Sequence, residues 1–171
     1  MHYADLEDLT LWLICAADDK PDWLDFWSAC YPSVCLSEIG GVPENWARQL
    51  VLPAGEHIAV AAYGAGTAAF AQWLFHADVP SRKKLKNIML ITPPPALSDG
   101  LCDDALRASC PCRAALVIGT GNSAEYEWKT AEWAKKWRAK RLIAPESGRL
   151  KTAADGWEWG MKLMQEMLLS D

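Results

Sequence analysis

Residues 60–72 carry the spacing of a tight turn that presents a nucleophile, but the nucleophilic side chain is missing. Such a turn joins a strand to a helix and is written G-x-S-x-G, with small residues because the backbone is sharply bent and strained. Read back from Gly66, the same frame in this chain is Ala62-Tyr63-Gly64-Ala65-Gly66. The serine position is therefore Gly64, which has no side chain. The sequence therefore predicts the strand-to-helix turn but no nucleophilic side chain at its centre.

Histidine is the usual general base beside such a nucleophile, and the chain has three: His2, His57 and His76. His57 opens the predicted strand that leads into the turn, so we expect it at the amino end of that strand, away from the chemistry. His76 ends the following predicted helix, where a histidine complements the helix dipole. A base must lie within hydrogen-bond reach of its nucleophile. We interpret all three histidines as structural.

Four other side chains are candidates to face the same cleft: Tyr63, Ser123, Ser147 and Cys15. A hydroxyl or thiol without a base is a weak nucleophile at neutral pH, the thiol least so. Cys15 lies in an apolar run, so burial is expected to raise its pKa and leave it inert. These residues leave open the alternative that the protein is an unconventional hydrolase, whose nucleophile stands at another position than residue 64.

Composition and charge exclude one class of partner. The chain has 171 residues and a formal net charge of −5, and no basic patch is dense enough for a phosphate backbone, so nucleic acid is not expected. The densest group of cations, at 135–141, falls on a predicted helix C-terminus, where cations complement the dipole. The ten tryptophans are interpreted mainly as packing residues of the core and its rim.

Six cysteines, at positions 15, 30, 35, 102, 110 and 112, accompany an N-terminus that does not resemble a secretory signal. No apolar run approaches the length of a membrane span, so no membrane association is expected. The sequence therefore predicts a reduced cytoplasmic protein. The cysteine spacing matches no zinc template and no histidine lies near it, so neither a metal nor a cofactor is expected.

The elements that must position these residues alternate between strand and helix. Apolar runs and helical spacing predict strands at 9–16, 34–39, 57–62, 86–92, 113–119 and 141–144, and helices at 22–30, from Pro43 onward, 67–76, 125–139 and 156–169. This order predicts an α/β fold with a mainly parallel sheet, built as a three-layer α/β/α sandwich. No linker or repeat interrupts residues 1–171, so one compact domain without a large cap is expected.

The order of several motifs resembles the small serine hydrolases of the retinoblastoma-binding-protein and YdeN type, which are single-domain α/β-hydrolases. The resemblance spans residues 9–169. It rests on Trp23 and Phe26 after the first strand, Pro43-x-x-Trp46-x-x-x-Leu50, the turn ending at Gly66 with Trp73 beyond it, Glu146-Ser147-Gly148, and Gly156 and Trp157 followed by Gly160. The resemblance implies an α/β-hydrolase fold and a place for a Ser–Asp–His triad.

Carried over position by position, the resemblance implies that the triad is lost. Gly64 replaces the nucleophile. Asn122, in Gly121-Asn122-Ser123, stands where the aspartate belongs, and an amide cannot stabilise an imidazolium by charge. An alignment without gaps puts Leu142 at the histidine position. Alternatively the histidine loop is deleted, because the stretch after Asn122 is shorter than in the family.

A pocket is expected to survive the loss of the triad, with Tyr63, Gly64, Ala65 and Asn122 as its ligand-binding residues. The backbone N–H of Ala65, at a helix start, is suited to an anion or a carbonyl. The first hypothesis is a non-catalytic hydrolase homologue that binds a protein partner or a small acyl or carboxylate ligand. The second is a weak carboxylesterase-type hydrolase with a displaced nucleophile. The third is an assembly subunit that uses a tryptophan-rich surface as a homodimer or partner interface.

Overall fold

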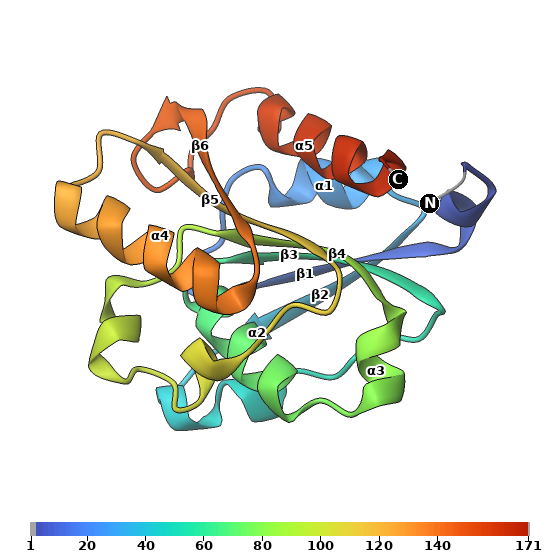
Figure 1. Ribbon diagram of the computed structural model, residues 1–171. Coiled ribbons are helices and arrows are strands. Elements are labelled where there is room, and N and C mark those ends of the chain that lie inside the picture. The colour runs from blue at the N-terminus through green and yellow to red at the C-terminus, as the bar shows by residue number, and fades with distance from the viewer. Residues whose placement is uncertain (1–2, 171) are drawn as a thin grey trace.

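The computed structural model describes residues 3–170 and contains one six-stranded sheet in which all neighbouring strands are parallel (Figure 1). The strand order is β2-β1-β3-β4-β5-β6. The strands are β1 (Leu9–Ala16), β2 (Ser33–Ile39), β3 (His57–Tyr63), β4 (Leu85–Ile91), β5 (Arg113–Thr120) and β6 (Lys140–Ser147). Parallel neighbours need long crossover connections, so the chain returns across the sheet between strands, mostly through helices.

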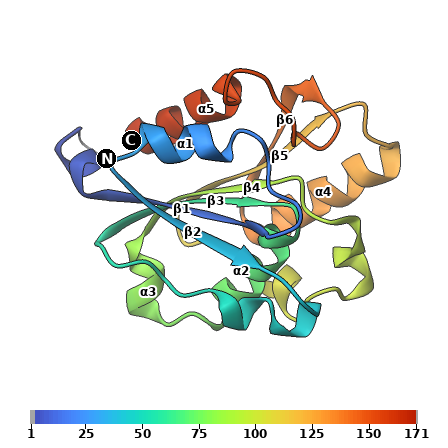
Figure 2. The ribbon, with the colours of Figure 1, turned by 180° about the vertical axis from the view of Figure 1, so that it is seen from behind.

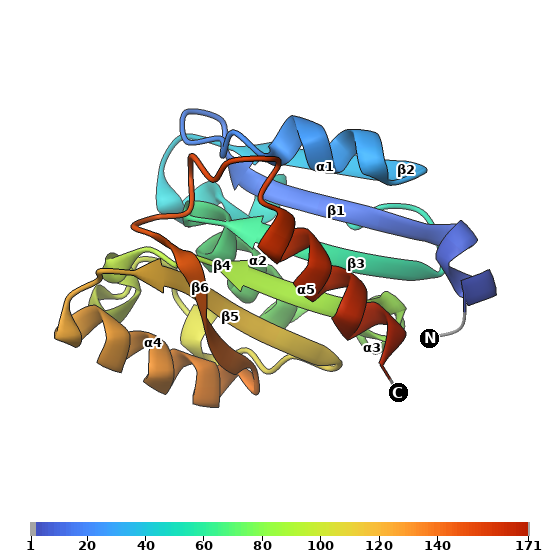
Figure 3. The ribbon, with the colours of Figure 1, turned by 90° about the horizontal axis from the view of Figure 1, so that it is seen from above.

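Helices cover both faces of the sheet, which confirms the predicted three-layer sandwich. On one face lie α1 (Leu24–Cys30) and α5 (Glu158–Leu169); on the other lie α2 (Ala65–His76), α3 (Val79–Lys84) and α4 (Ala124–Trp137) (Figures 1 and 2). Figure 3 looks onto the first face and shows α5 passing over the middle of the sheet. Within residues 3–170, no helix combines the length and apolar composition needed to cross a membrane.

Side chains alternate along β3 and so divide the core into two clusters. Val60 and Ala62 point toward α2 and α4, whereas Ala61 and Tyr63 point toward α1 and α5. This period of two is the ordinary geometry of a strand. It decides which of the two buried faces of the sheet each residue before the turn joins.

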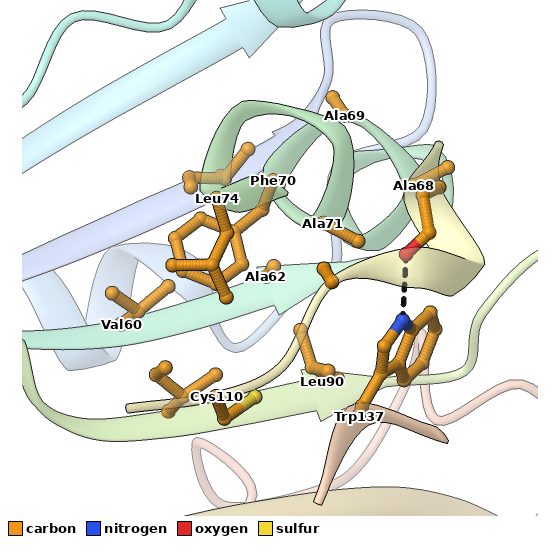
Figure 4. Close-up of a cluster of buried hydrophobic side chains, with 14 of the residues drawn as sticks. Val60, Ala62, Ala68, Ala69, Phe70, Ala71, Leu74, Leu90, Cys110 and Trp137 are labelled. Carbon is orange, nitrogen blue, oxygen red and sulfur yellow. Dashed lines mark hydrogen bonds between the residues drawn. The ribbon is translucent and has the colours of Figure 1, made fainter. Parts of the chain in front are cut away.

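The α2 side of the core is shown in Figure 4. Phe70 and Leu74 of α2 pack there with Val60 and Leu90 of the sheet. Trp137 closes this cluster from α4, and its indole N–H donates to the carbonyl of Ala105 at 2.8 Å. Each fully buried side chain of this kind stabilises the fold by about 1.5–3 kcal/mol. This packing fixes α2 and α4 against the same face of the sheet.

The segment after Pro43 differs from the prediction. In place of a helix it forms two 3-10 turns, Pro43–Asn45 and Ala47–Gln49. The side-chain amide of Gln49 donates to the carbonyl of Gly40 at 2.8 Å and accepts from the N–H of Gly40 at 3.0 Å. These two bonds close the segment into a compact loop, which leaves no length for an α-helix.

The sequence predicts no helix at 79–84, yet α3 forms there. The carboxylate of Asp78 accepts a hydrogen bond from the Ser81 N–H at 2.8 Å, and Pro80 lies in the first turn. Both features are typical of helix starts. The helix spans only six residues, so it carries no apolar periodicity that could have revealed it.

Candidate functional site

The predicted turn lies between β3 and α2. Gly64 has φ 56° and ψ −127°, outside the regions that residues with a Cβ adopt readily, and α2 begins at the next residue. The N–H of Gly64 donates to the carbonyl of Ile91 at 3.0 Å. The carbonyl of Gly64 accepts from the N–H of Thr67 at 3.0 Å and from its hydroxyl at 2.8 Å. Glycine holds this backbone without strain.

Gly66 brings the start of α2 against the sheet. A Cβ at this position would lie 2.5 Å from the carbonyl oxygen of Ile14 in β1. That contact is with backbone, so no side-chain movement could relieve it. The last glycine of the frame is therefore required by packing.

A pocket of about 500 Å³ lies above this turn, at the edge where the parallel strands end. Its walls come from five connections that are distant in sequence. They contribute Asp19 after β1, Gly64 and Ala65 after β3, residues 92–95 after β4, residues between 122 and 129 after β5, and Arg149 after β6. Open parallel sheets bind ligands at this carboxyl edge.

Three of the four predicted ligand-binding residues, Gly64, Ala65 and Asn122, line this pocket. Tyr63 is not among the lining residues. Its side chain is buried on the α1–α5 face against Trp23, with the ring centroids 6.2 Å apart. Alternation along β3 turns its side chain to that face, outside the pocket lining, and its role in ligand binding stays a prediction.

The positions assigned to the triad's acid and base are not brought together. The side-chain amide of Asn122 donates to the carbonyl of Gly119 at 2.9 Å, a bond that fixes its own loop. Leu142 lies within β6 opposite Val117 and packs toward the α5-side cluster, away from the pocket. β6 continues to Ser147, beyond its predicted end. The connection that reaches the pocket is the following one, residues 148–157 (Figure 3).

An ion pair occupies the space above Gly64. Nη2 of Arg149 bonds Oδ2 of Asp19, and Nζ of Lys151 lies 3.1 Å from Oδ1 of the same carboxylate. A Cβ built on Gly64 would lie 3.2 Å from Asp19 Oδ2 and 3.8 Å from Arg149 Nη2. The charged pair thus lies directly against the position that a Cβ at residue 64 would take.

Asp19 and Arg149 hold each other in the charged state. Burial opposes the charge on Asp19, but hydrogen bonds from Arg149 and Lys151 outweigh it and hold the pKa of this carboxyl below its usual value. The same hydrogen bond to Asp19 raises the pKa of Arg149. Because the side chain of Arg149 is 57% exposed, water screens the pair, and it contributes little to stability.

Asp19 and Arg149 were absent from the predicted site, although each stands in a connection that follows a predicted strand. Asp19 follows the first strand and Arg149 the last. Because the carboxyl ends of parallel strands meet at one edge of the sheet, opposite charges in two such connections are the signal that could have revealed the pair.

The backbone around Arg149 is fixed on both sides. The carbonyl of Arg149 accepts from the hydroxyl of Thr92 at 2.9 Å, and the carbonyl of Leu150 accepts from the indole N–H of Trp23 at 2.8 Å. Thr92 and Leu150 have φ of 48° and 60°, which is rare for such side chains. Backbone strain of this kind persists only where the surroundings over-determine it. The side chain of Arg149 therefore extends from a rigid backbone.

A cluster of three tryptophans anchors the connection 148–157. The rings of Trp23, Trp27 and Trp157 are almost wholly buried, with centroids 4.7–5.8 Å apart, and the indole N–H of Trp27 donates to the carbonyl of Gly156 at 2.8 Å. Trp128 is the one tryptophan that is mostly exposed, at 66%. The interpretation of the tryptophans as packing residues agrees with the six that are buried: Trp12, Trp23, Trp27, Trp133, Trp137 and Trp157.

No histidine or cysteine is among the described residues that line the pocket. His57 opens β3 at the opposite edge of the sheet, and His76 ends α2 with its Nε2 3.4 Å from Oδ2 of Asp104. His2 lies outside the described residues. Cys15 is buried, and burial is the main cause that raises its pKa to about 11. The pocket therefore has no imidazole or thiolate from the described part of the chain.

Ser123 is the one predicted alternative nucleophile that lines the pocket. Its Oγ accepts from the N–H of Tyr126 at 3.1 Å and caps α4. Ser147 is exposed at the end of β6 and is not part of the lining. Among residues 3–170, no three His, Cys, Asp or Glu side chains are grouped to hold a metal ion.

No family model and no curated protein matches the chain. Solved structures nevertheless share its architecture. A protein called a YdeN-like hydrolase, from Pectobacterium atrosepticum, superposes with a TM-score of 0.74 at 16% identity, over 95% of this chain and 91% of the other.

Two further structures are similar. A protein called a thioesterase, from a Silicibacter species, has a TM-score of 0.65 at 12% identity, over 95% of this chain and 73% of the other. A protein called a CIB-like hydrolase, from Thermoplasma acidophilum, has a TM-score of 0.63 at 13% identity, over 96% and 88%. Likeness at this level of identity shows the fold alone, so the chain has an α/β-hydrolase-type fold.

Proposed function

We propose that this protein is a non-catalytic protein of the α/β-hydrolase fold that binds a small acyl or carboxylate ligand in the pocket above Gly64. The observation that carries the proposal is the Asp19–Arg149 ion pair directly against the position that a Cβ at residue 64 would take. Gly64 has no atom with which to attack a substrate. The amide of Asn122 is engaged in its own loop. Together these features support binding without turnover.

The chemistry of the pocket supports an acyl or carboxylate ligand. The guanidinium of Arg149 presents donors in a planar fork that matches a carboxylate. The N–H groups of Ala65 and Gly66, at the start of α2, have no acceptor within the helix and favour an anion or a carbonyl. Residues 93–95, all proline, and the ring of Tyr126 add apolar surface. The names hydrolase and thioesterase, given to proteins of similar fold, are consistent with an acyl site.

A fluorophosphonate probe and a series of carboxylates test the proposal together. We expect no labelling of the purified protein and a rise in Tm with medium-chain carboxylates, because a ligand at a hundredfold excess over its Kd stabilises the folded state by about 2.7 kcal/mol. Ala65→Leu should fill the pocket and abolish the rise. The exposed Ala154→Leu is the matched control and should keep it. Stoichiometric labelling would overturn the proposal.

A weak hydrolase is the second candidate, because Ser123 lines the same pocket as the start of α2. Binding and backbone donors alone give roughly a thousandfold acceleration without a triad. Turnover of short p-nitrophenyl esters that Ser123→Ala abolishes would support this candidate. Absence of turnover across ester chain lengths would exclude it.

A protein partner or a homodimer is a further form that the binding function can take. The exposed ring of Trp128 is the surface tryptophan that such an interface would use. We further propose that the protein works in the reducing cytoplasm, because all six cysteines are free. Light scattering of the wild type and of Trp128→Ala tests the homodimer. A homodimer requires the mass of two chains for the wild type and of one chain for the variant.

A further inference from the structure

We propose that Asp19 is an internal competitor for the ligand: a small organic monocarboxylate binds by replacing the Asp19 carboxylate on the guanidinium of Arg149. This inference rests on the proposed function and specifies how the same pocket recognises its ligand. It assigns Arg149 as the residue that selects a carboxylate. It assigns Asp19 as the residue that sets the threshold affinity for such a ligand.

The geometry gives the exchange a place to occur. Arg149 and Asp19 both line the pocket, and their contact lies within reach of the missing side chain of Gly64. The Asp19 side chain is 22% exposed, and that of Arg149 is 57% exposed, so a ligand in the pocket can approach the guanidinium from the open side. A carboxylate is the group that Asp19 itself presents to Arg149, so a ligand carboxylate would reproduce an interaction that the site already makes.

Asp19 keeps a cationic partner after the exchange. Nζ of Lys151 lies 3.1 Å from its other oxygen, Oδ1, and is independent of Arg149. A charge left without any partner would cost several kcal/mol where it is partly buried. Lys151 removes most of that cost, because Asp19 remains paired with it. The exchange therefore releases Arg149 without isolating Asp19.

Arg149 can change partners without moving its backbone. Its carbonyl is bonded to Thr92, and the next carbonyl, of Leu150, is bonded to Trp23. The ring of Tyr63 lies beneath the guanidinium, with 5.9 Å between its centroid and Cζ of Arg149. Such a ring supports a cation from below. Only the outer side chain has to adjust when the carboxylate of a ligand arrives.

The other cation of the pocket is already engaged. Nζ of Lys129 lies 3.3 Å from Oε1 of Glu125 on the same helix. Residues 93–95 and Tyr126 form apolar surface beside it. These features favour a ligand with one carboxylate and an apolar body.

The experiment compares octanoate with octanamide, which differ in charge but match in shape. Binding to the wild type, Asp19→Asn, Arg149→Gln and Arg149→Lys is measured by titration calorimetry, with circular dichroism to show that each variant is folded. Lys135→Gln is the matched control, because it removes a cation of the same helix, α4, that is paired with Glu132 and does not line the pocket.

Five results are expected. The wild type prefers octanoate to octanamide. Asp19→Asn tightens octanoate binding by about threefold and leaves octanamide unchanged, because the Asp19–Arg149 pair that octanoate must replace is screened by water and is weak. Arg149→Gln loses the preference for octanoate. Arg149→Lys, which keeps the charge but not the fork, loses part of it, and Lys135→Gln keeps it.

The failure of this inference is distinguishable from the failure of the proposed function. If the wild type binds octanoate and octanamide equally and Arg149→Gln changes nothing, the pocket binds acyl chains but the exchange is overturned. If neither compound binds the wild type and octanoate binds Asp19→Asn, the competition is supported. If neither compound binds any variant, both the exchange and the acyl-binding function are overturned.

Discussion

Two features of the structure favour glycine at position 64: the backbone conformation and the nearby charge of Asp19. Its φ of 56° favours glycine, and the space beside its Cα is taken by a carboxylate oxygen of Asp19. A serine there would be strained and would meet the Asp19–Arg149 pair. The loss of the hydroxyl and the presence of the ion pair therefore belong to the same local structure.

Gly64→Ser is expected to destabilise the protein by about 1–3 kcal/mol through backbone strain and the contact with Asp19. It is expected to produce no ester hydrolysis, because no imidazole from residues 3–170 lines the pocket. Urea unfolding followed by tryptophan fluorescence and a p-nitrophenyl acetate assay measure the two effects. Gly41→Ser is the control, since Gly41 has φ 77° and a Cβ there meets nothing within 4 Å. Ester turnover in Gly64→Ser would contradict the interpretation that base and acid are lost as well.

Two tyrosines near the pocket differ in what their hydroxyls contact. The hydroxyl of Tyr63 is buried and has no hydrogen-bond partner among the described residues, and burial is the main cause that raises its pKa to about 12. The hydroxyl of Tyr126 donates to the carbonyl of Pro93 at 2.6 Å. We expect Tyr126→Phe to cost about 0.5–1.5 kcal/mol in the free energy of unfolding, whereas Tyr63→Phe leaves it unchanged or raises it. Equal losses in the two variants by urea titration would show that Tyr63 has a partner, such as bound water.

At the scale of elements, strands were more predictable than connections. The run 9–16 is continuously apolar because β1 is buried on both faces, and it was predicted with its observed ends. β6 is an edge strand with alternating exposure, so its apolar pattern is weaker and its predicted end fell short of Ser147. α3 depends on a cap and a proline instead of periodicity and was missed.

The connection 148–157 could not be predicted from its own residues. Its shape depends on hydrogen bonds from Trp23 and Trp27, which are separated from their acceptors by 127 and 129 positions in the sequence. Local propensity gives no reason for Leu150 to adopt a positive φ. The two lining residues that follow β3 were predictable because a short motif fixes them, whereas Arg149 reaches the pocket through contacts that only the folded chain contains.

Trp23→Phe should loosen this connection. The variant removes the indole donor to the buried carbonyl of Leu150, for which we expect a loss of about 1–3 kcal/mol in the free energy of unfolding. We also expect faster amide hydrogen exchange in residues 148–157. Trp128→Phe is the control, because this ring is 66% exposed and should change stability by about 0.5 kcal/mol or less. Normal exchange in Trp23→Phe would show that the connection is held by other contacts.

At the scale of the whole molecule, the thiols report how tightly the layers are packed. Burial is the main cause that raises the pKa of Cys102 to about 11 and those of Cys110 and Cys112 to about 12, whereas Cys30 is exposed. Thiolates are the reactive form, so we expect one rapid equivalent with Ellman's reagent at pH 8 from Cys30, a slower one from the half-buried Cys35, and the remainder only in urea. Cys30→Ser should remove the rapid phase. Several rapid equivalents in the native protein would mean that the core opens readily.

Gly66 shows that the G-x-S-x-G pattern contains residues needed for packing as well as a residue needed for catalysis. Its contact with the backbone of Ile14 would forbid any larger residue whether or not the chain performs a reaction. The last glycine of a motif that is usually taken as a signature of hydrolysis is therefore required because the helix approaches the strand closely. A search that scores such glycines will find proteins that share this helix–strand packing. Only the residue between the glycines shows whether a nucleophile is present.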